Sequence, residues 1–305
     1  MTIGIILHPY GEEKPAGLAR AIFELTQALI AHDTENEYIL YLKTKPHAPP
    51  DISGKNWSIE PLGGGMFWLE KLRTARASDI YIFNTPVLPL FFKPKRSIAL
   101  ALDFAYCHFP GAKARGRVAR AFTKLYHGFS MKKADRIITM SDATKKDILL
   151  FFPRIPREKI ITCHWGYKRI GDIPEEPMPI SGEFFLFAGV IKERKNVFAV
   201  VRAFREFVRE GGRHNLVIAG KGSGAYANSI RRFIGLEGIE DRVIMPGFVR
   251  EGQLAYLYKN AEALVFPSFI EGFGFPVLEA MSLGAPVITS NASSVCRETK
   301  FNTCR

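Results

Sequence analysis

The stretch EALVFPSFIEGFGFPVLEAMSLGAPVITS, residues 262–290, contains one complete repeat of a parallel sheet. Its pattern predicts an apolar strand over 262–267, a helix over 276–284 and a second strand over 285–290. Parallel strands need a crossover connection of this kind, usually a helix. The stretch therefore predicts an α/β fold.

The same alternation runs along the whole chain. It is interrupted once, by GDIPEEPMPISGE at 171–183, where three prolines exclude a helix or a central strand and favour an exposed, stiff connector. We therefore predict an N-terminal domain at 1–170, a linker at 171–182 and a C-terminal domain at 183–305, each a parallel sheet with helices on both faces. The other expected strands are 2–7, 38–42, 79–84, 97–102, 136–140, 159–164, 184–189, 215–220 and 242–247, and the other expected helices are 18–31, 196–210, 225–235 and 251–260.

Composition excludes several classes of protein. The longest apolar run, FFLFAGVI from Phe184, is far shorter than the roughly 20 residues of a membrane span. The first residues lack a basic leader, so we expect a cytoplasmic protein. No HExxH or CxxC pattern suggests a metal site or a disulfide framework. The cysteines are Cys107, Cys163, Cys296 and Cys304.

The formal charge of +12 is concentrated in the first half of the chain, where residues 1–170 hold 26 Lys and Arg against 15 Asp and Glu, a net +11. The stretch 112–136 combines many cations with Val118, Phe122, Leu125 and Tyr126, which is typical of a basic amphipathic helix at an anionic membrane surface. The alternative is a solvated helix packed on its sheet. No nucleic-acid-binding motif accompanies the charge, so we expect no nucleic-acid partner. The cations are Lys113, Arg115, Arg117, Arg120, Lys124, Lys132, Lys133 and Arg136.

Two glutamates, Glu271 and Glu279, stand on either side of the turn GFGFP. In open α/β sheets ligands bind at the carboxyl ends of strands, and helix amino termini there bind phosphate through free N–H groups. Gly272 and Gly274 would let the backbone approach a ligand, and Pro276 suits the first helical position. The pattern predicts a binding site. The alternative is an acidic first turn that suits the helix dipole.

A second candidate is the loop in FAGVIKERKNV, residues 187–197, where a strand ends at Gly189 and Lys192, Arg194 and Lys195 follow. These cations could hold a diphosphate, because contacts from Arg and Lys to phosphate oxygens are strong. The alternative is a solvated charged face. IAGKGSG, residues 218–224, has neither P-loop nor GxGxxG order, so we expect a plain turn there.

Taken together, these segments resemble the nucleotide-sugar-binding half of retaining GT-B glycosyltransferases of family GT4. The resemblance rests on GVIKERKN, NLVIAGKGSG, RVIMPGFV and LAYLYKNAEALVFPSFIEGFGFPVLEAMSLGAPVITSNASS within 183–294, including the E-x7-E spacing of Glu271 and Glu279. It extends more loosely through PAGLARAIFELTQAL, LDFAYCHFP and ADRIITMSDATKKDI, so nearly the whole chain is covered. It implies a GT-B fold, with two Rossmann-like doubly wound domains facing a cleft and the second domain incomplete.

The resemblance also implies a site. A nucleoside diphosphate sugar is the expected substrate, without cofactor or metal. Its diphosphate would lie near Arg194 and Lys195, its base near the backbone of Phe248 and Val249, and its ribose at Glu279. The residues expected in catalysis are Glu271, Arg194, Lys195 and Asp103, and those expected to bind the donor are Gly17, Gly189, Phe248, Val249, Gly272, Phe273, Gly274 and Glu279.

Two features depart from the family pattern. Where the family often has a His-Asp pair, this chain has Leu102 and Asp103, which leaves Asp103 and His108 as candidates for the role of the absent histidine. After SSV the chain reads CRETKFNTCR, where the family usually shows a Pro-Glu dipeptide and further elements. We therefore expect a truncated second domain.

The resemblance implies a retaining, metal-independent hexosyltransferase, peripheral on the cytoplasmic face of a membrane, for surface polysaccharide or lipopolysaccharide. The expected donor is GDP-mannose, and the acceptor is a saccharide or a lipid-linked saccharide. Two alternatives stay open: a catalytically inactive remnant, favoured by the absent histidine and the short end, and a binder of anionic polymers that uses the N-terminal charge.

Overall fold

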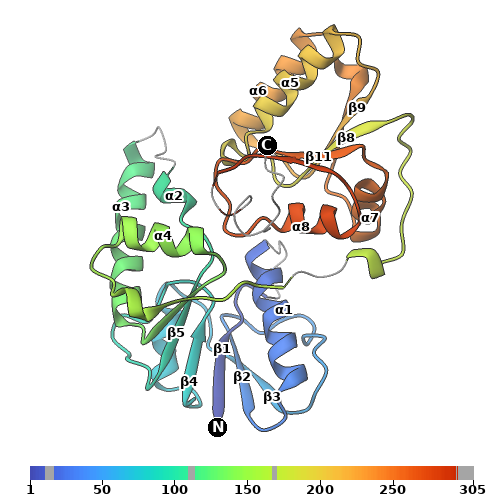
Figure 1. Cartoon of the computed structure of the whole chain (residues 1–305). Coiled ribbons are helices and arrows are strands. Elements are labelled where there is room, and N and C mark those ends of the chain that lie inside the picture. The colour runs from blue at the N-terminus through green and yellow to red at the C-terminus, as the bar shows by residue number, and fades with distance from the viewer. Residues whose placement is uncertain (11–16, 109–113, 167–169, 293, 295–305) are drawn as a thin grey trace. The chain divides into compact units, whose positions relative to one another are not determined.

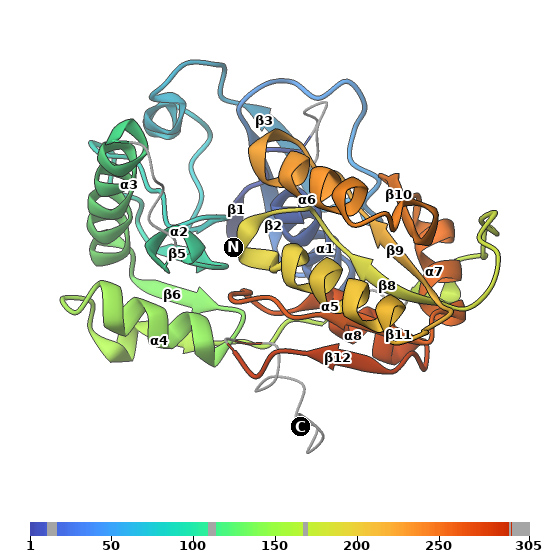
Figure 2. The same cartoon turned by 90° about the horizontal axis from the view of Figure 1, so that it is seen from above.

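The computed structural model describes residues 1–10, 17–108, 114–166, 170–292 and 294. The chain divides into two compact units, Met1–Cys163 and His164–Arg305, and each has its own parallel sheet (Figures 1 and 2). The predicted α/β class with two doubly wound sheets is confirmed. Lys113 of the basic stretch and the end of the chain from Cys296, on which the expectation of truncation rests, lie outside the described residues.

The sheet of the first unit has seven parallel strands in the order β3-β2-β1-β4-β5-β6-β7. β2 is nearly all buried, as an interior strand of a parallel sheet covered on both faces requires. β3 was not predicted from the sequence, because its five residues WSIEP form a short segment that ends in proline and lies only partly buried at the edge of the sheet. The strands are β1 (Thr2–Ile6), β2 (Glu37–Leu42), β3 (Trp57–Pro61), β4 (Ile80–Phe83), β5 (Ser97–Ala101), β6 (Arg136–Thr139) and β7 (Ile160–Thr162).

Helices lie beside both halves of this sheet. Figure 1 shows α1 beside β1, β2 and β3, and α3 and α4 beside β5. The Ser141 hydroxyl starts α4 by accepting a hydrogen bond from the backbone N–H of Thr144 at 3.1 Å. Within the described residues of either unit, no helix is both long enough and apolar enough to cross a membrane. The helices of this unit are α1 (Gly17–His32), α2 (Ala105–His108), α3 (Ala114–Lys133) and α4 (Asp142–Phe151), with 3-10 turns η1 (Trp68–Arg73) and η2 (Arg157–Lys159).

The sheet of the second unit has five parallel strands in the order β10-β9-β8-β11-β12. Figure 1 shows α5 and α6 on one side of it and α7 and α8 on the other. Its strands are β8 (Phe184–Ala188), β9 (Asn215–Ala219), β10 (Val243–Gly247), β11 (Ala263–Phe266) and β12 (Val287–Thr289). Its helices are α5 (Val197–Arg209), α6 (Gly224–Leu236), α7 (Glu251–Asn260) and α8 (Phe275–Ser282), with 3-10 turns η3 (Ile170–Asp172), η4 (Glu193–Lys195) and η5 (Glu240–Arg242).

The proline-rich segment 171–182 falls within the second unit and is mostly exposed. Two of its carboxylates reach α7: Glu175 pairs with Lys259 at 2.7 Å, and Glu176 pairs with Arg250. The backbone N–H of Glu176 also donates to the carbonyl oxygen of Gly252 at 3.1 Å. The segment therefore lies along α7.

Candidate functional site

The site begins at the carboxyl edge of the second sheet, where three neighbouring strands end at Gly189, Gly220 and Gly247. All three glycines have positive φ, at 144°, 148° and 77°. A Cβ atom on Gly220 would lie 2.0 Å from the carbonyl oxygen of Gly189, so this approach of two backbones requires glycine. Gly189, which was predicted to bind the sugar donor, is thus one of three glycines at the carboxyl edge of this sheet.

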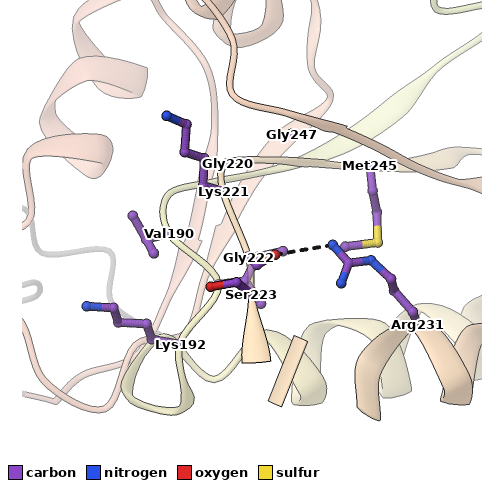
Figure 3. Close-up of a pocket in the computed structure, with 10 residues that line it drawn as sticks. Val190, Lys192, Gly220, Lys221, Gly222, Ser223, Arg231, Met245 and Gly247 are labelled. Carbon is purple, nitrogen blue, oxygen red and sulfur yellow. Dashed lines mark hydrogen bonds between the residues drawn. The ribbon is translucent and has the colours of Figure 1, made fainter. Parts of the chain in front are cut away.

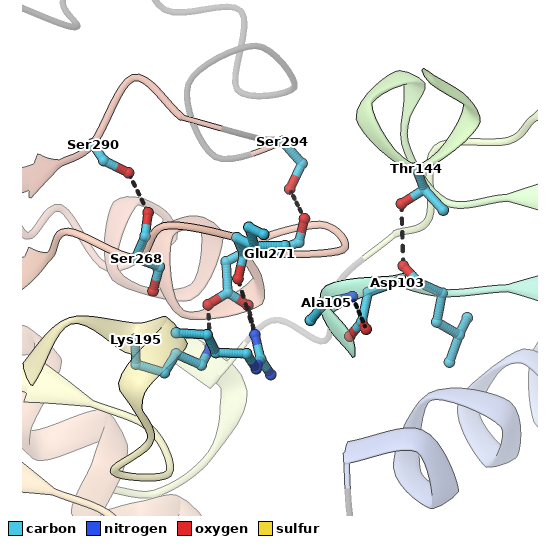
Figure 4. Close-up of polar contacts among 11 residues, drawn as sticks. Asp103, Ala105, Thr144, Lys195, Ser268, Glu271, Ser290 and Ser294 are labelled. Atoms are coloured by element: carbon cyan, nitrogen blue, oxygen red, sulfur yellow. Dashed lines mark hydrogen bonds and ion pairs between the residues drawn. The ribbon is translucent and has the colours of Figure 1, made fainter. Parts of the chain in front are cut away.

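Three predicted catalytic residues of this unit meet at that edge. Nζ of Lys195 lies 2.5 Å from Oε1 of Glu271, and Nη1 of Arg194 lies 3.3 Å from Oε2 of the same carboxylate (Figure 4). Lys195 and Glu271 are only 7% and 8% exposed, so the pair is shielded from solvent. The two cations and one carboxylate carry a net charge of +1.

Neighbouring strands bring this group together. β8 and β11 pair directly, so the loops that follow them start at the same edge. The backbone N–H of Phe269 donates to the carbonyl oxygen of Arg194 at 2.9 Å, which joins the two loops. Nη1 of Arg194 also donates to the carbonyl oxygen of Ile270 at 3.0 Å, and Nζ of Lys195 lies 4.6 Å from the centre of the Phe266 ring.

The turn after Glu271 is buried and leads into α8. Gly272, Phe273 and Gly274 are all buried, and Gly274 precedes the helix with φ of 99°. The hydroxyl of Ser294 donates to the carbonyl oxygen of Glu271 at 2.9 Å, which holds the turn from the other side. The positive end of α8 lies directly after this turn, where the sequence predicts a phosphate-binding position. The backbone N–H groups of Val277 and Leu278 donate to the carbonyl oxygen of Gly274 at 3.0 and 3.4 Å.

Glu279, the predicted ribose ligand, lies in α8 and is half-buried. Its Oε2 accepts a hydrogen bond from the hydroxyl of Tyr258 at 3.1 Å, and Tyr258 is fully buried in α7. Tyr258 was not predicted, because it meets Glu279 through the packing of α7 against α8 and not through any sequence pattern.

A cavity of about 470 Å³ opens beside the glycine edge (Figure 3). The turn that follows β9 forms one wall, so the stretch predicted to be a plain turn also lines a cavity. Nη2 of Arg231 donates to the carbonyl oxygen of Gly222 at 3.3 Å across it. The lining residues are Val190, Ile191, Lys192, Gly220, Lys221, Gly222, Ser223, Arg231, Met245 and Gly247.

The two residues predicted near the base follow β10. Phe248 is 68% exposed, and Nζ of Lys221 lies 4.8 Å from the centre of its ring. Val249 is instead partly buried against the core of the second unit. An exposed aromatic ring next to a cavity can stack on a planar ligand. Arg231 and Lys221 were not predicted, because exposed cations on a helix and in a turn carry no distinguishing pattern.

The predicted residues of the first unit lie at the carboxyl edge of its own sheet. Gly17 is the first residue of α1. The carboxylate of Asp103 accepts from the backbone N–H of Ala105 at 3.1 Å, so it caps the short helix α2 (Figure 4). His108, the other candidate for the absent histidine, lies 2.9 Å through Nε2 from the carboxylate of Asp147.

A group that could hold a metal ion lies elsewhere. Among the described residues, the ligand atoms of Glu183, His214 and Glu262 come within 4.8 Å of one another. They precede β8, β9 and β11, so they lie at the amino edge of the sheet, opposite the glycines. They are therefore not part of the candidate site.

Comparison with known proteins agrees with this geometry. Residues 172–300 match the family "Glycosyl transferases group 1". O-antigen chain mannosyltransferase B of Escherichia coli is 30% identical over 70% of this chain and 58% of its own length. O-antigen chain mannosyltransferase RfbU of Salmonella typhimurium is 28% identical over 55% of this chain and 46% of its own length. The chain thus spans about half the length of these curated relatives.

Solved structures show the same fold at low identity. Sucrose-phosphate synthase from Thermosynechococcus elongatus superposes with a TM-score of 0.71 at 19% identity, covering 96% of this chain and 82% of that one. WaaG, a glycosyltransferase of lipopolysaccharide biosynthesis, gives 0.67 at 16% identity over 98% and 83%. Residues 172–300 therefore match the glycosyl transferases group 1 family, and the chain has the GT-B fold of glycosyltransferases.

Proposed function

We propose that this chain is a retaining glycosyltransferase that moves a hexose from a nucleoside diphosphate sugar to a saccharide or lipid-linked acceptor. The observation that carries the proposal is the contact of Arg194 and the buried Lys195 with the buried Glu271, beside the amino terminus of α8. It combines two cations for phosphate oxygens with a carboxylate for sugar hydroxyls, next to the positive end of a helix.

The proposed reaction depends on stabilising the negative charge that develops on the leaving diphosphate. The bond between the anomeric carbon and the phosphate oxygen breaks, and the acceptor oxygen forms the new bond on the same face of the sugar. The acceptor proton passes to the leaving diphosphate, on which negative charge grows. Arg194, Lys195 and the positive end of α8 would stabilise that charge without a metal ion, because fixed charges and dipoles need no reorganisation during the reaction.

The donor and acceptor classes rest on relatives. The two O-antigen mannosyltransferases favour mannose, and hence GDP-mannose, as the donor. The GT-B structures include one determined with UDP and glucose, so a uridine donor is the competing outcome of the test. Phe248 and the cavity behind it would receive the base, and Glu279 would bind the ribose. Contact of residues 112–136 with an anionic membrane face completes the proposal.

Thermal unfolding of the 305-residue chain tests the donor site. A ligand that binds only the folded state raises the melting temperature, because it stabilises by RT ln(1 + [L]/Kd). GDP, UDP, dTDP and their sugars are compared at equal concentration. We expect a selective shift with GDP and GDP-mannose, and its loss in Glu279→Ala.

Tyr258→Phe is the matched control for that variant. It removes the same hydrogen bond between α7 and α8 but leaves the carboxylate of Glu279 in place. It should therefore retain most of the nucleotide shift. Equal loss in both variants would assign the effect to packing rather than to ribose binding. No shift with any nucleotide, in a chain that melts cooperatively, contradicts the proposal and favours the inactive remnant.

A further inference from the structure

One cation reaches the cavity of the second unit from a helix rather than from a strand end. Arg231 lies in the second half of α6, and its side chain extends toward the turn at Gly222 (Figure 3). Its Nη2 donates to the carbonyl oxygen of Gly222 at 3.3 Å, and its Nη1 donates to Oδ1 of Asn228 at 3.2 Å. These two hydrogen bonds orient the plane of the guanidinium at the cavity wall.

The charge of Arg231 has no carboxylate partner among the residues that the structure describes. Its two acceptors are a carbonyl oxygen and an amide oxygen, and neither carries a charge. Arg205, Arg209 and Arg250 of the same unit, by contrast, each pair with a glutamate. The guanidinium also has more N–H groups than the two hydrogen bonds use. Arg231 can therefore still donate to a ligand.

Backbone hydrogen bonds hold the walls of this cavity together. The N–H of Ile191 donates to the carbonyl oxygen of Lys221 at 2.9 Å. The N–H of Gly220 donates to the carbonyl oxygen of Gly247 at 2.7 Å. A Cβ atom on Gly222 would lie 2.7 Å from Cδ1 of Ile191, so this turn packs directly on that side chain. A ligand would meet a wall that is already in place, which lowers the cost of binding.

The lining favours a flat ligand with hydrogen-bond acceptors along one edge. Ile191 and Met245 contribute apolar surface, and a thioether makes favourable contacts with aromatic rings. The charged side chains of the lining are Lys192, Lys221 and Arg231, and no carboxylate is among the described residues that form it. An edge with N–H donors would find few acceptors here, whereas an edge with acceptors would gain charge-assisted hydrogen bonds.

Guanine is the nucleobase that presents such an edge. Its O6 and N7 are neighbouring acceptors, and one guanidinium can donate to both. Adenine places the N6 amino group beside N7, so a donor would face the donors of Arg231. Uracil offers only O4 at the corresponding edge. The planar fork of an arginine therefore favours guanine over the other two bases.

We propose that Arg231 selects guanine as the base of the nucleoside diphosphate sugar by donating to O6 and N7. Lys221 lines the cavity and lies 4.8 Å from the centre of the Phe248 ring, so the ring expected to stack on the base is next to the same wall. The inference rests on the proposed function, because it names the base within that donor site. It assigns to a residue of this chain a choice that otherwise depends on relatives.

The alternative role for Arg231 is contact with a phosphate group. Phosphate oxygens also accept strongly from arginine. Every nucleoside diphosphate carries the same phosphates, so that role would make all of them depend equally on Arg231. The two roles are therefore separated by changing the base.

Calorimetric titration of the full chain with modified nucleotides tests the contact atom by atom. IDP keeps O6 and N7 but lacks the 2-amino group, whereas 7-deaza-GDP lacks only N7. We expect IDP to bind like GDP and 7-deaza-GDP to bind about tenfold more weakly. In Arg231→Ala, GDP should bind about tenfold more weakly. Loss of N7 should then have no further effect, because its partner is already absent.

Arg231→Gln tests the selection of the base. A carboxamide can accept from N6 of adenine and donate to its N7. The preference for GDP over ADP should therefore fall about tenfold or more, and the affinity for UDP should stay unchanged. Arg232→Gln is the matched control, because Arg232 is the neighbouring exposed arginine of α6 and does not line the cavity. It removes the same charge and should leave every affinity unchanged.

Three outcomes would overturn the inference. Equal weakening of GDP, ADP and UDP in Arg231→Gln would assign Arg231 to a phosphate. Equal affinity of the unsubstituted chain for GDP and 7-deaza-GDP, or tighter binding of UDP than of GDP, would exclude guanine selection at N7. In each of these cases the chain still binds a nucleotide, so the proposed function stands. Failure of the folded chain to bind any of these nucleotides contradicts the proposed function itself.

Discussion

Nζ of Lys195 and Oε1 of Glu271 lie 2.5 Å apart, and both side chains are more than nine-tenths buried. Removing one partner of such a pair leaves a buried charge with less compensation, which costs more than the pair itself contributes. Arg194 remains beside Glu271 at 3.3 Å and limits that cost. The pair therefore couples the stability of the second unit to its candidate site.

Lys195→Met should lower the free energy of unfolding by about 2 kcal/mol, because Glu271 loses its shorter ion pair and retains the one with Arg194. Adding Glu271→Gln removes the remaining buried charge and should recover about half of that loss. Urea unfolding of the single and double variants measures both values. Strict additivity of the two substitutions would show that the pair is not coupled.

Lys195→Ala should also slow transfer from GDP-mannose. Removing one fixed donor from a developing charge costs about 3 kcal/mol, or more than a hundredfold in turnover. Turnover is measured at saturating donor, at a temperature where the variant remains folded. A decrease of less than about tenfold would exclude Lys195 from stabilising the leaving diphosphate.

Phe248→Ala separates binding from stability. Its ring is 68% exposed, so the free energy of unfolding should change by less than about 0.5 kcal/mol. If the ring stacks on the base, the affinity for GDP should fall about tenfold, since base stacking on an aromatic ring contributes about 1 to 3 kcal/mol. Calorimetric titration measures the affinity. Leu236→Ala, at 75% exposure, serves as the control.

Gly220→Ala should destabilise the second unit more than Gly189→Ala. Both positions have φ between 144° and 148°, which strains any residue with a side chain. A Cβ at Gly220 would in addition lie 2.0 Å from the carbonyl oxygen of Gly189, whereas the nearest atom to a Cβ at Gly189 is 3.8 Å away. We expect losses of about 4 and about 2 kcal/mol in urea unfolding.

His127 should make the first unit sensitive to acid. Burial lowers its pKa from 6.5 to about 4. The unfolded chain binds this proton at a higher pH than the folded chain does, so the free energy of unfolding falls as pH drops from 6.5 to about 4. The loss is at most about 3 kcal/mol.

His127→Gln tests this pH dependence, because the amide can still bond to the hydroxyl of Tyr106, which lies 2.9 Å from Nδ1 of His127. The variant should flatten the decline in stability across the same pH range in urea unfolding. A decline of unchanged steepness would assign the acid sensitivity to other groups.

The sequence predicted the fold well where strands are apolar and alternate with helices. Strand ends were placed within a few residues, since β11 occupies Ala263–Phe266 within the predicted 262–267. It missed β3, whose residues alternate between apolar and polar but form only a short edge strand that ends in proline. Edge strands are defined by a neighbour, here β2, and that pairing is not encoded locally.

The sequence predicted candidate residues for the site but not which of them contact one another. Arg194 and Glu271 are 77 residues apart, and only the pairing of β8 with β11 brings them together. On α3 the sequence pattern placed Tyr126 with the apolar residues of the amphipathic face. The structure directs the hydroxyl of Tyr126 to the carbonyl oxygen of Leu88 at 2.7 Å and exposes Phe129 instead.

The number of Lys and Arg residues in α3 also overestimates how many cations are available to a partner. Nζ of Lys124 lies 5.4 Å from the centre of the Phe151 ring, and Lys133 donates to three carbonyl oxygens of the loop at 89–92. Sequence counting cannot separate cations that serve internal contacts from those that face solvent. The charge available to an outside partner is therefore smaller than the number of Lys and Arg residues suggests.

The carboxylate of Glu271 has a further consequence for selectivity. It already occupies both cations in the free protein, so an incoming anion must exchange with a partner that is in place. Inorganic phosphate would gain little from that exchange, because it leaves the displaced carboxylate without a compensating contact. A diphosphate joined to a sugar can contact the cations and also offer hydroxyls to Glu271. Discrimination at this site would then arise from ligand exchange rather than from attraction to positive charge.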